Sequence, residues 1–217
     1  MVKGVIFDMD GLMFDTERLW DTFWEPCCKR LGLPMPTPEF MASGRGLAGE
    51  NLRRHLAEYY PQIEPEVMLK EVYELAEERF RHPVPCKPGL RELLDWLKEH
   101  HIPCIVASSS PRSMIENNLK NTGVDGYFQG VVCGADVEHS KPAPDIFLKA
   151  AAQLGLPATD CLVLEDSFNG VRAGHAAGAV TVMVPDLAQP DEEIKQLYTY
   201  CCHDLLEVRQ MLEDGKL

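Results

Sequence analysis

Long hydrophobic runs are absent from this 217-residue sequence. No stretch approaches the ~18 consecutive apolar residues that a membrane-spanning helix needs, so we expect no membrane insertion. The short apolar run near the N-terminus meets an acidic pair after only a few residues, which is not the pattern of a secretory signal peptide. We therefore expect a cytoplasmic protein.

Positive charge is scarce. The sequence has 21 Lys and Arg against 34 Asp and Glu, a net charge of −13. Such a chain repels nucleic acid and anionic membrane surfaces, so we expect neither as a partner. A site for an anionic ligand must gather its positive charge locally. A monomer is the simplest expectation for the assembly.

Cysteine and histidine patterns typical of zinc sites are also missing. The eight cysteines form no CxxC pair, and the seven histidines show no ligand spacing. Several cysteines lie inside apolar segments, which is typical of reduced, buried thiols. With 45% hydrophobic residues, the chain has the composition of a globular protein that can bury a proper core.

From residue 102 onward, short β-rich runs alternate with helical segments. The expected strands are VIF near the N-terminus and then IPCIVASSS, VVCG, CLVLEDS and VTVMV. The helices between them end at glycine, as helix C-termini often do. This alternation predicts a doubly wound, parallel α/β sheet, a Rossmann-like core.

Residues 16–82 show helical spacing of apolar residues and no strand pattern. We expect three helices here, the first bent or interrupted at Pro26. The predicted domains are an α/β core of residues 1–15 and 83–217 and a helical cap of residues 16–82, inserted after the first strand. GRGLAG at 44–49 matches a dinucleotide-binding pattern formally, but it follows no strand and fits a cap turn better.

Polar side chains follow several predicted strands at the point where each ends. Asp8 and Asp10 leave the first strand on the same side of the chain. Because the carboxyl ends of parallel strands meet at one edge of a sheet, residues from other strands should join them there. The other side chains expected at this edge are Ser108, Ser109, Ser110, Lys141, Glu165 and Asp166.

Clustered carboxylates repel one another, and a divalent cation removes that repulsion. Oxygen ligands without histidine or cysteine favour Mg²⁺, which usually keeps sites for water and phosphate oxygens. Ser108 and the amides at the start of the following helix can bind such oxygens, and Lys141 supplies positive charge. The pattern predicts a phosphoryl-transfer site for a small phosphorylated metabolite.

Two aspartates can divide this chemistry. Asp8, nearest the rigid strand, can attack phosphorus, and Asp10 can carry the proton of the leaving oxygen. Simpler roles stay open: the pair as turn residues, Ser108 as a helix cap, Lys141 as a surface residue, and Glu165 as a structural hydrogen-bond acceptor instead of a metal ligand.

FDMDG, the serine after IVA, the lysine of SKPAPD and LEDS together resemble the four motifs of the haloacid dehalogenase (HAD) superfamily. The resemblance covers nearly the whole chain, and the nearest subgroup is that of β-phosphoglucomutases and sugar phosphatases. It implies an aspartyl-phosphate intermediate on Asp8, with Asp10 as acid and base. The implied Mg²⁺ ligands are Asp8, the Asp10 carbonyl and Asp166, with Glu165 assisting. Ser108 and Lys141 are implied to hold the phosphoryl group.

The cap of this subgroup selects the substrate. β-Phosphoglucomutases carry a histidine where this chain has Trp20, and they carry a cap arginine for which Arg45 is a candidate. Trp20 resembles the sugar phosphatases more closely. We therefore expect a Mg²⁺-dependent phosphatase acting on a small phosphomonoester, with a sugar phosphate as the expected substrate. The alternative is a β-phosphoglucomutase-type phosphomutase.

Two further functions fit the residues less well. A dehalogenase would need neither Asp10 nor a metal ligand such as Asp166. A catalytically silent binding protein would be expected to lack one of the catalytic residues, and all are present.

Overall fold

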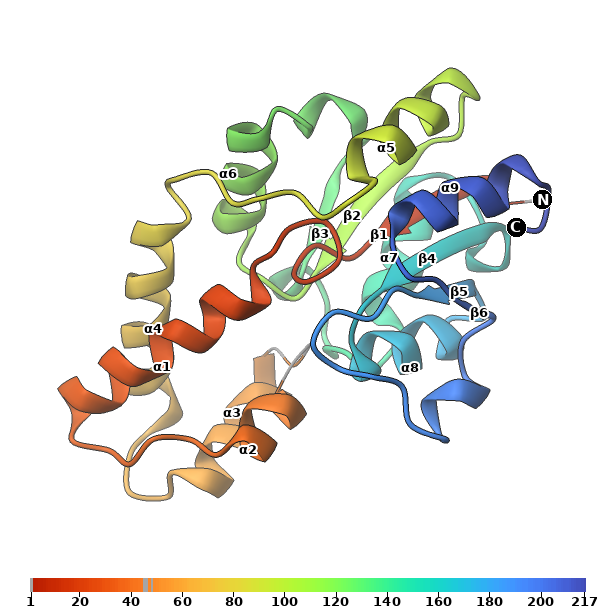
Figure 1. Cartoon of the computed structure of the whole chain (residues 1–217). Coiled ribbons are helices and arrows are strands. Elements are labelled where there is room, and N and C mark those ends of the chain that lie inside the picture. Colours follow the sequence, from red (N-terminus) through yellow and green to blue (C-terminus); the bar gives the residue numbers. More distant parts are fainter. Residues whose placement is uncertain (1, 45–46, 48) are drawn as a thin grey trace.

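A computed structural model describes residues 2–44, 47 and 49–217. Its centre is a six-stranded sheet with the strand order β3-β2-β1-β4-β5-β6 (Figure 1). The strands are β1 (Gly4–Phe7), β2 (Cys104–Ser108), β3 (Val131–Cys133), β4 (Cys161–Glu165), β5 (Val180–Met183) and β6 (Tyr200–Cys201). Neighbouring strands are parallel, which confirms the predicted doubly wound sheet.

The chain builds the sheet outward from β1 in two directions. β2 and β3 extend it on one side, and β4, β5 and β6 extend it on the other. Ligands of such sheets bind where the strand order reverses, beyond the carboxyl ends of the strands, which here is the end of β1. β6 was not predicted, because Tyr200 and Cys201 are exposed and form no apolar run.

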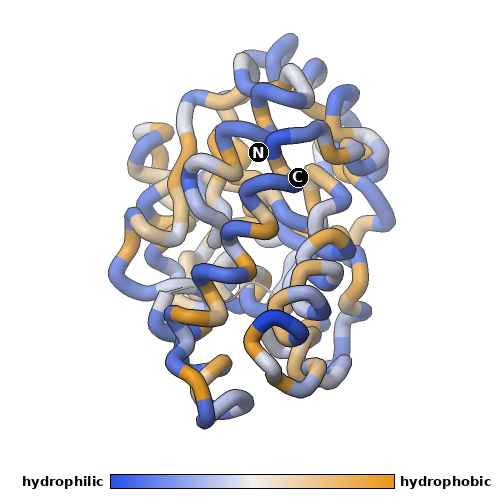
Figure 2. The backbone as a smooth tube through the Cα atoms, turned by 90° about the vertical axis from the view of Figure 1, so that its left-hand side faces the viewer, coloured by the Kyte–Doolittle hydropathy of each residue, from blue (hydrophilic) through white to orange (hydrophobic). Residues whose placement is uncertain are grey.

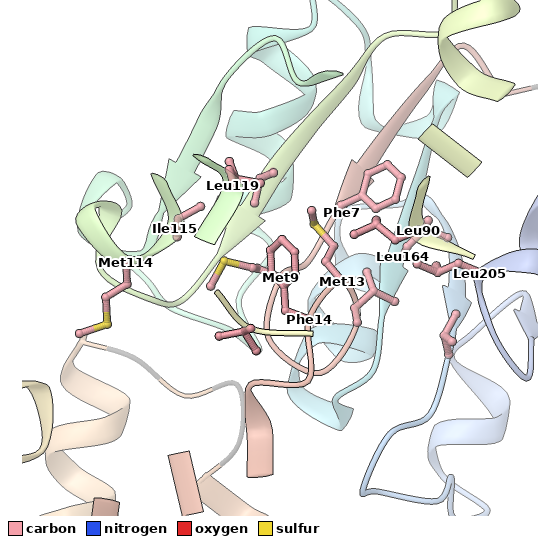
Figure 3. Close-up of a cluster of buried hydrophobic side chains, with 14 of the residues drawn as sticks. Phe7, Met9, Met13, Phe14, Leu90, Met114, Ile115, Leu119, Leu164 and Leu205 are labelled. Carbon is pink, nitrogen blue, oxygen red and sulfur yellow. The ribbon is translucent and has the colours of Figure 1, made fainter. Parts of the chain in front are cut away.

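Helices cover both faces of the sheet. One layer contains α5 (Leu90–Glu99), α6 (Arg112–Thr122) and α9 (Leu205–Glu213), and the other contains α7 (Asp145–Gln153) and α8 (Phe168–Ala176). Strand alternation divides β1 between these layers: Phe7 packs with Leu90 and Leu205 (Figure 3), and Ile6 faces the opposite layer. The sheet edge is thereby held on both faces.

Four further helices lie to one side of the sheet (Figure 1), and we call them the cap. They are α1 (Glu17–Leu31), α2 (Pro38–Gly44), α3 (Gly49–Tyr59) and α4 (Pro65–Arg79). Of the bend or interruption expected at Pro26, the interruption was wrong, since α1 continues through this residue. Burial of the flanking Phe23 and Cys27 offsets the one backbone hydrogen bond that proline removes. The short helix α2 was not predicted. The domain boundaries themselves remain a prediction.

The chain enters the cap directly from the end of β1. Gly11 turns with a φ of 77°, a backbone conformation that glycine adopts readily, and its N–H bonds Phe14 O at 3.0 Å. Phe14 then forms an isolated bridge with Cys86, where the chain returns to the core. Blue and orange residues alternate along the backbone in Figure 2, and no described helix is long and apolar enough to cross a membrane.

Candidate active site

The ends of β1, β2 and β4 bring the predicted side chains to one edge of the sheet. Phe7 pairs in register with Val106 on one side and Leu164 on the other, so Asp8 lies level with Glu165. The side chains at this edge are nearly inaccessible: the exposed fraction is 6% for Asp8 and 0% for Glu165. Water therefore screens their charges poorly.

Lys141 binds both of these carboxylates. Its Nζ donates to Asp8 Oδ1 at 2.5 Å and to Glu165 Oε1 at 2.6 Å, and the side chain is 1% exposed. Burial alone would lower the pKa of Lys141, but the charges of the two carboxylates outweigh it and raise that pKa. Lys141 is thus the local positive charge that the acidic sequence requires.

Glu165 is held on both carboxylate oxygens. Oε1 accepts from Lys141, and Oε2 accepts from the Asp166 N–H at 3.0 Å and from both the N–H and the hydroxyl of Ser167. A Cβ on Gly170 would lie 1.8 Å from the Glu165 carboxyl carbon, so the first turn of α8 needs glycine there. This geometry is that of the structural acceptor left open from the sequence. Direct metal ligation by Glu165 stays a prediction.

Asp8, Glu165 and Asp166 form a compact acidic cluster. Each offers an oxygen, and these oxygens lie within 4.8 Å of one another. Burial, and then neighbouring acidic charge, raises the pKa of Asp166 well above its usual value, and burial does the same for Asp8 against the opposing effect of Lys141. Gly11 makes room here, because a Cβ on it would approach Asp166 Oδ2 to 2.2 Å. An oxygen-only donor set of this kind fits a hard divalent cation.

Asp10 lies apart from Lys141, with its own set of donors. Ser110 Oγ donates to Asp10 Oδ2 at 2.7 Å, and Ser108 Oγ donates to the same oxygen at 3.3 Å. Trp20 Nε1 donates to Oδ1 at 3.2 Å. Sequence reasoning placed Ser110 at this edge with Ser108 and Ser109 but gave it no role, and its hydrogen bond to Asp10 was not predicted. Ser109 lines the cleft described next.

A cleft that is partly open to solvent separates this edge from the cap. Its core side carries Asp8, Asp10 and Asp166, and Trp20 lies on its cap side. Asn51 of α3 also reaches from the cap to the core, where its Nδ2 donates to Ser140 Oγ at 3.0 Å. No sequence pattern marked Asn51. Arg45, the other predicted cap residue, lies outside the described residues.

A match to a known protein family covers most of the chain. A family model described as "Haloacid dehalogenase-like hydrolase" matches residues 5–184. The chain belongs to this family. The match runs from Val5 in β1 to the residue after β5, and it includes the cap and every described residue of the acidic edge.

Relatives of this HAD hydrolase include named phosphatases. The chain is 38% identical to a probable pseudouridine-5'-phosphatase of Drosophila melanogaster, over 85% of this chain and 82% of the relative. It is 31% identical to the fructose-1-phosphate phosphatase YqaB of Escherichia coli, over 83% of this chain and 95% of the relative. The chain is accordingly an enzyme of the phosphoric monoester hydrolase class.

A solved structure shows the same fold. A β-phosphoglucomutase from Clostridium difficile superposes with a TM-score of 0.84 at 22% identity, covering 100% of this chain and 97% of that one. At this identity the likeness concerns the fold alone. It confirms a HAD core with a helical cap and leaves the choice between phosphatase and mutase to the site and the closer relatives.

Proposed function

We propose that this HAD hydrolase is a Mg²⁺-dependent phosphatase that forms an aspartyl-phosphate on Asp8. One observation carries the proposal. Lys141 and the acidic cluster surround Asp8, while Asp10 is held two residues away by hydroxyl and indole donors. The two aspartates thus have separate surroundings, as a nucleophile and a proton carrier require.

Asp8 is the nucleophile in this scheme. Lys141 occupies its Oδ1, so we assign Oδ2 to attack on phosphorus. Lys141 remains beside the reacting group and stabilises negative charge on the phosphoryl oxygens. The Ser108 hydroxyl lies at the same edge and can donate to these oxygens. Ser109 also lines the cleft and can do the same.

Asp10 moves the proton. Its carboxyl group lies between the serines after β2 and Trp20 of the cap, so it faces the side from which a leaving group departs. In the first step Asp10 protonates the leaving alcohol. In the second it takes a proton from the water that hydrolyses the aspartyl-phosphate.

The residues present fit a divalent cation. Asp8 and Asp166 would hold it through carboxylate oxygens, together with the Asp10 carbonyl, and Glu165 would fix Lys141 and the start of α8. When bound, the ion neutralises clustered acidic charge and draws electron density from phosphoryl oxygens. Mg²⁺ suits the oxygen-only donors, and we propose it as the ion.

The substrate we propose is a small phosphomonoester, with sugar phosphates as its class. The relatives named above, a probable pseudouridine-5'-phosphatase and a fructose-1-phosphate phosphatase, support phosphatase activity on such esters. We further propose that the enzyme works in the cytoplasm as a monomer. Light scattering of the purified protein tests the assembly.

Hydrolysis assays test the proposal. Purified enzyme should release phosphate from p-nitrophenyl phosphate with Mg²⁺ and lose that activity with EDTA. Asp8→Asn should lower turnover by roughly 10⁴-fold or more, because the nucleophile is gone. Asp160→Asn is a matched control, since Asp160 pairs with Lys3 at the surface away from the site. Full activity of Asp8→Asn would contradict the mechanism.

A mutase assay separates the alternative. A phosphatase should form no glucose 6-phosphate from β-glucose 1-phosphate and a trace of glucose 1,6-bisphosphate, whatever amount of phosphate it releases. Accumulation of glucose 6-phosphate would instead support a phosphomutase on the same core.

A further inference from the structure

Among the described residues, the cap side of the cleft is mainly apolar. Apart from Trp20, its hydrophobic and aromatic side chains include Trp24, Phe40, Leu52, Leu69 and Tyr73. They come from all four cap helices, whereas the polar residues of the cleft come mostly from the core. A substrate that is held by its phosphate at the core therefore meets a hydrophobic wall with its leaving group.

Ring contacts fix this wall in place. Trp24 packs edge-on against Phe40, with ring centroids 6.0 Å apart and planes at 88°. Phe40 stacks on His55 at 4.2 Å and 10°. Because these rings come from α1, α2 and α3, they hold three helices in one arrangement before any ligand binds. A preformed wall selects ligands by shape.

The wall is not part of the closed cap interior. Along α4, Met68 and Ala76 are buried among the cap helices and do not line the cleft, whereas Leu69 and Tyr73 are only half-buried and line it. Apolar surface that stays accessible inside a cleft favours binding when a ligand covers it. The favourable ligand is one that presents apolar surface of its own.

Two polar groups of the wall already have partners. Trp20 Nε1 donates to Asp10, and His55 Nε2 lies 3.0 Å from Phe40 O. The hydroxyls of a bare polyol would be buried against hydrocarbon, where a polar group without a hydrogen bond is unfavourable. A planar ring can instead lie against Trp24, Leu69 and Tyr73.

We propose that the substrate is a phosphomonoester whose alcohol carries a planar ring system with apolar faces, as in a nucleoside 5'-monophosphate or an arylalkyl phosphate. The inference rests on the phosphatase function proposed above and names its substrate class. A sugar phosphate meets the condition when the sugar bears such a ring, and a simple hexose or pentose phosphate does not.

Matched esters test the inference with the full-length, Mg²⁺-loaded enzyme. Uridine 5'-monophosphate and ribose 5-phosphate are both primary esters of ribose and differ mainly in the base. 2-Phenylethyl phosphate and glucose 6-phosphate make a second comparison of ring against polyol. We expect kcat/KM to be at least about tenfold higher for at least one ring-bearing ester than for both polyol esters.

A pair of variants on α4 locates the effect. Leu69→Ala should reduce the preference for the ring-bearing ester at least about fivefold, because it removes part of the wall while Asp8 and Asp10 stay in place. Val67→Ala is the control, since Val67 is 46% exposed and is not among the residues that line the cleft. It should leave the preference unchanged. Leu52→Ala on α3 repeats the test if Leu69→Ala folds poorly.

The outcomes separate the two claims. Mg²⁺-dependent hydrolysis with equal or better kcat/KM for the polyol esters would overturn the substrate class and leave the phosphatase function standing. A ring preference that neither wall variant reduces would also overturn it. Failure of every ester, p-nitrophenyl phosphate included, would overturn the proposed function and this inference together.

Discussion

The two sides of the cleft are fixed in different ways. On the core side, Lys141, Asp8 and Glu165 are buried, charged and tied to one another or to backbone N–H groups. On the cap side, half-buried rings such as Trp24 and Tyr73 are held by packing between helices. The core side thus depends on particular atoms, while the cap side depends on shape and can change residue by residue without disturbing the chemistry.

Loss of the positive charge of Lys141 should impair the core side of the cleft more than the other changes considered below. Lys141→Met leaves two buried carboxylates without their partner, so we expect kcat/KM to fall by roughly 10³-fold. Initial rates with p-nitrophenyl phosphate at saturating Mg²⁺ measure this. Lys149→Met is the control, since Lys149 is exposed and its Nζ contacts the Asp136 carbonyl. Similar rates for the two variants would contradict the role of Lys141.

Trp20 lines the cap side of the cleft and also donates a hydrogen bond to Asp10 on the core side. Its replacement should lower activity less than that of Lys141. Trp20→Phe keeps an aromatic ring beside Phe23 and Phe80 but removes the N–H that donates to Asp10. We expect kcat to fall about tenfold with KM nearly unchanged, because proton transfer suffers more than binding. Trp96→Phe, on a core helix, is the matched control. A change confined to KM would show that Trp20 acts on binding alone.

The smallest effect concerns stability without metal. The pKa of Asp166 in the folded protein is raised above its ordinary value of 3.8, first by burial and then by Glu17 and other acids. A raised pKa contributes stability below the unfolded value, and that contribution is lost as pH rises through the folded pKa. The metal-free protein should therefore lose stability from about pH 4 upward.

Asp166→Asn removes this loss. In EDTA at pH 7.5 the variant should melt several degrees above the wild type, since 1 kcal/mol corresponds to about 2–4 °C in a protein of this size. The difference should vanish near pH 4. Mg²⁺ should raise the Tm of the wild type but not of the variant. A variant that melts lower than the wild type in EDTA at both pH values would contradict the assignment.

Sequence reasoning succeeded where a feature depends on neighbours along the chain. The strand before Asp8 and the strand before Glu165 are short apolar runs, so the parallel sheet places both acids at one edge without further information. The family match confirms the motif-based resemblance. Pro26 shows the limit of local rules, because packing of α1 against α4 outweighs the propensity of one residue.

Contacts between the cap and the core could not be predicted in the same way. Asn51 and Ser140 are 89 positions apart and have no motif, so only the packing of α3 brings them together. The hydrogen bond from Ser110 to Asp10 could not be predicted either, since SSS offers three hydroxyls and the turn after β2 decides which of them reach Asp10. Trp20 was suspected from its place in DTERLW, but its hydrogen bond depends on the direction in which α1 leaves the loop.

Direct detection of the phosphorylated residue tests the central claim most closely. The enzyme is mixed with p-nitrophenyl phosphate and Mg²⁺ and quenched in acid within milliseconds. It is then reduced with borohydride, and the modified residue is located by mass spectrometry. Because p-nitrophenolate leaves without being protonated, Asp10→Asn should slow hydrolysis more than formation of the intermediate and raise the trapped fraction. We predict that borohydride converts Asp8, and no other residue, to homoserine. Modification of a different residue, or turnover with no trapped intermediate in either protein, would contradict the account.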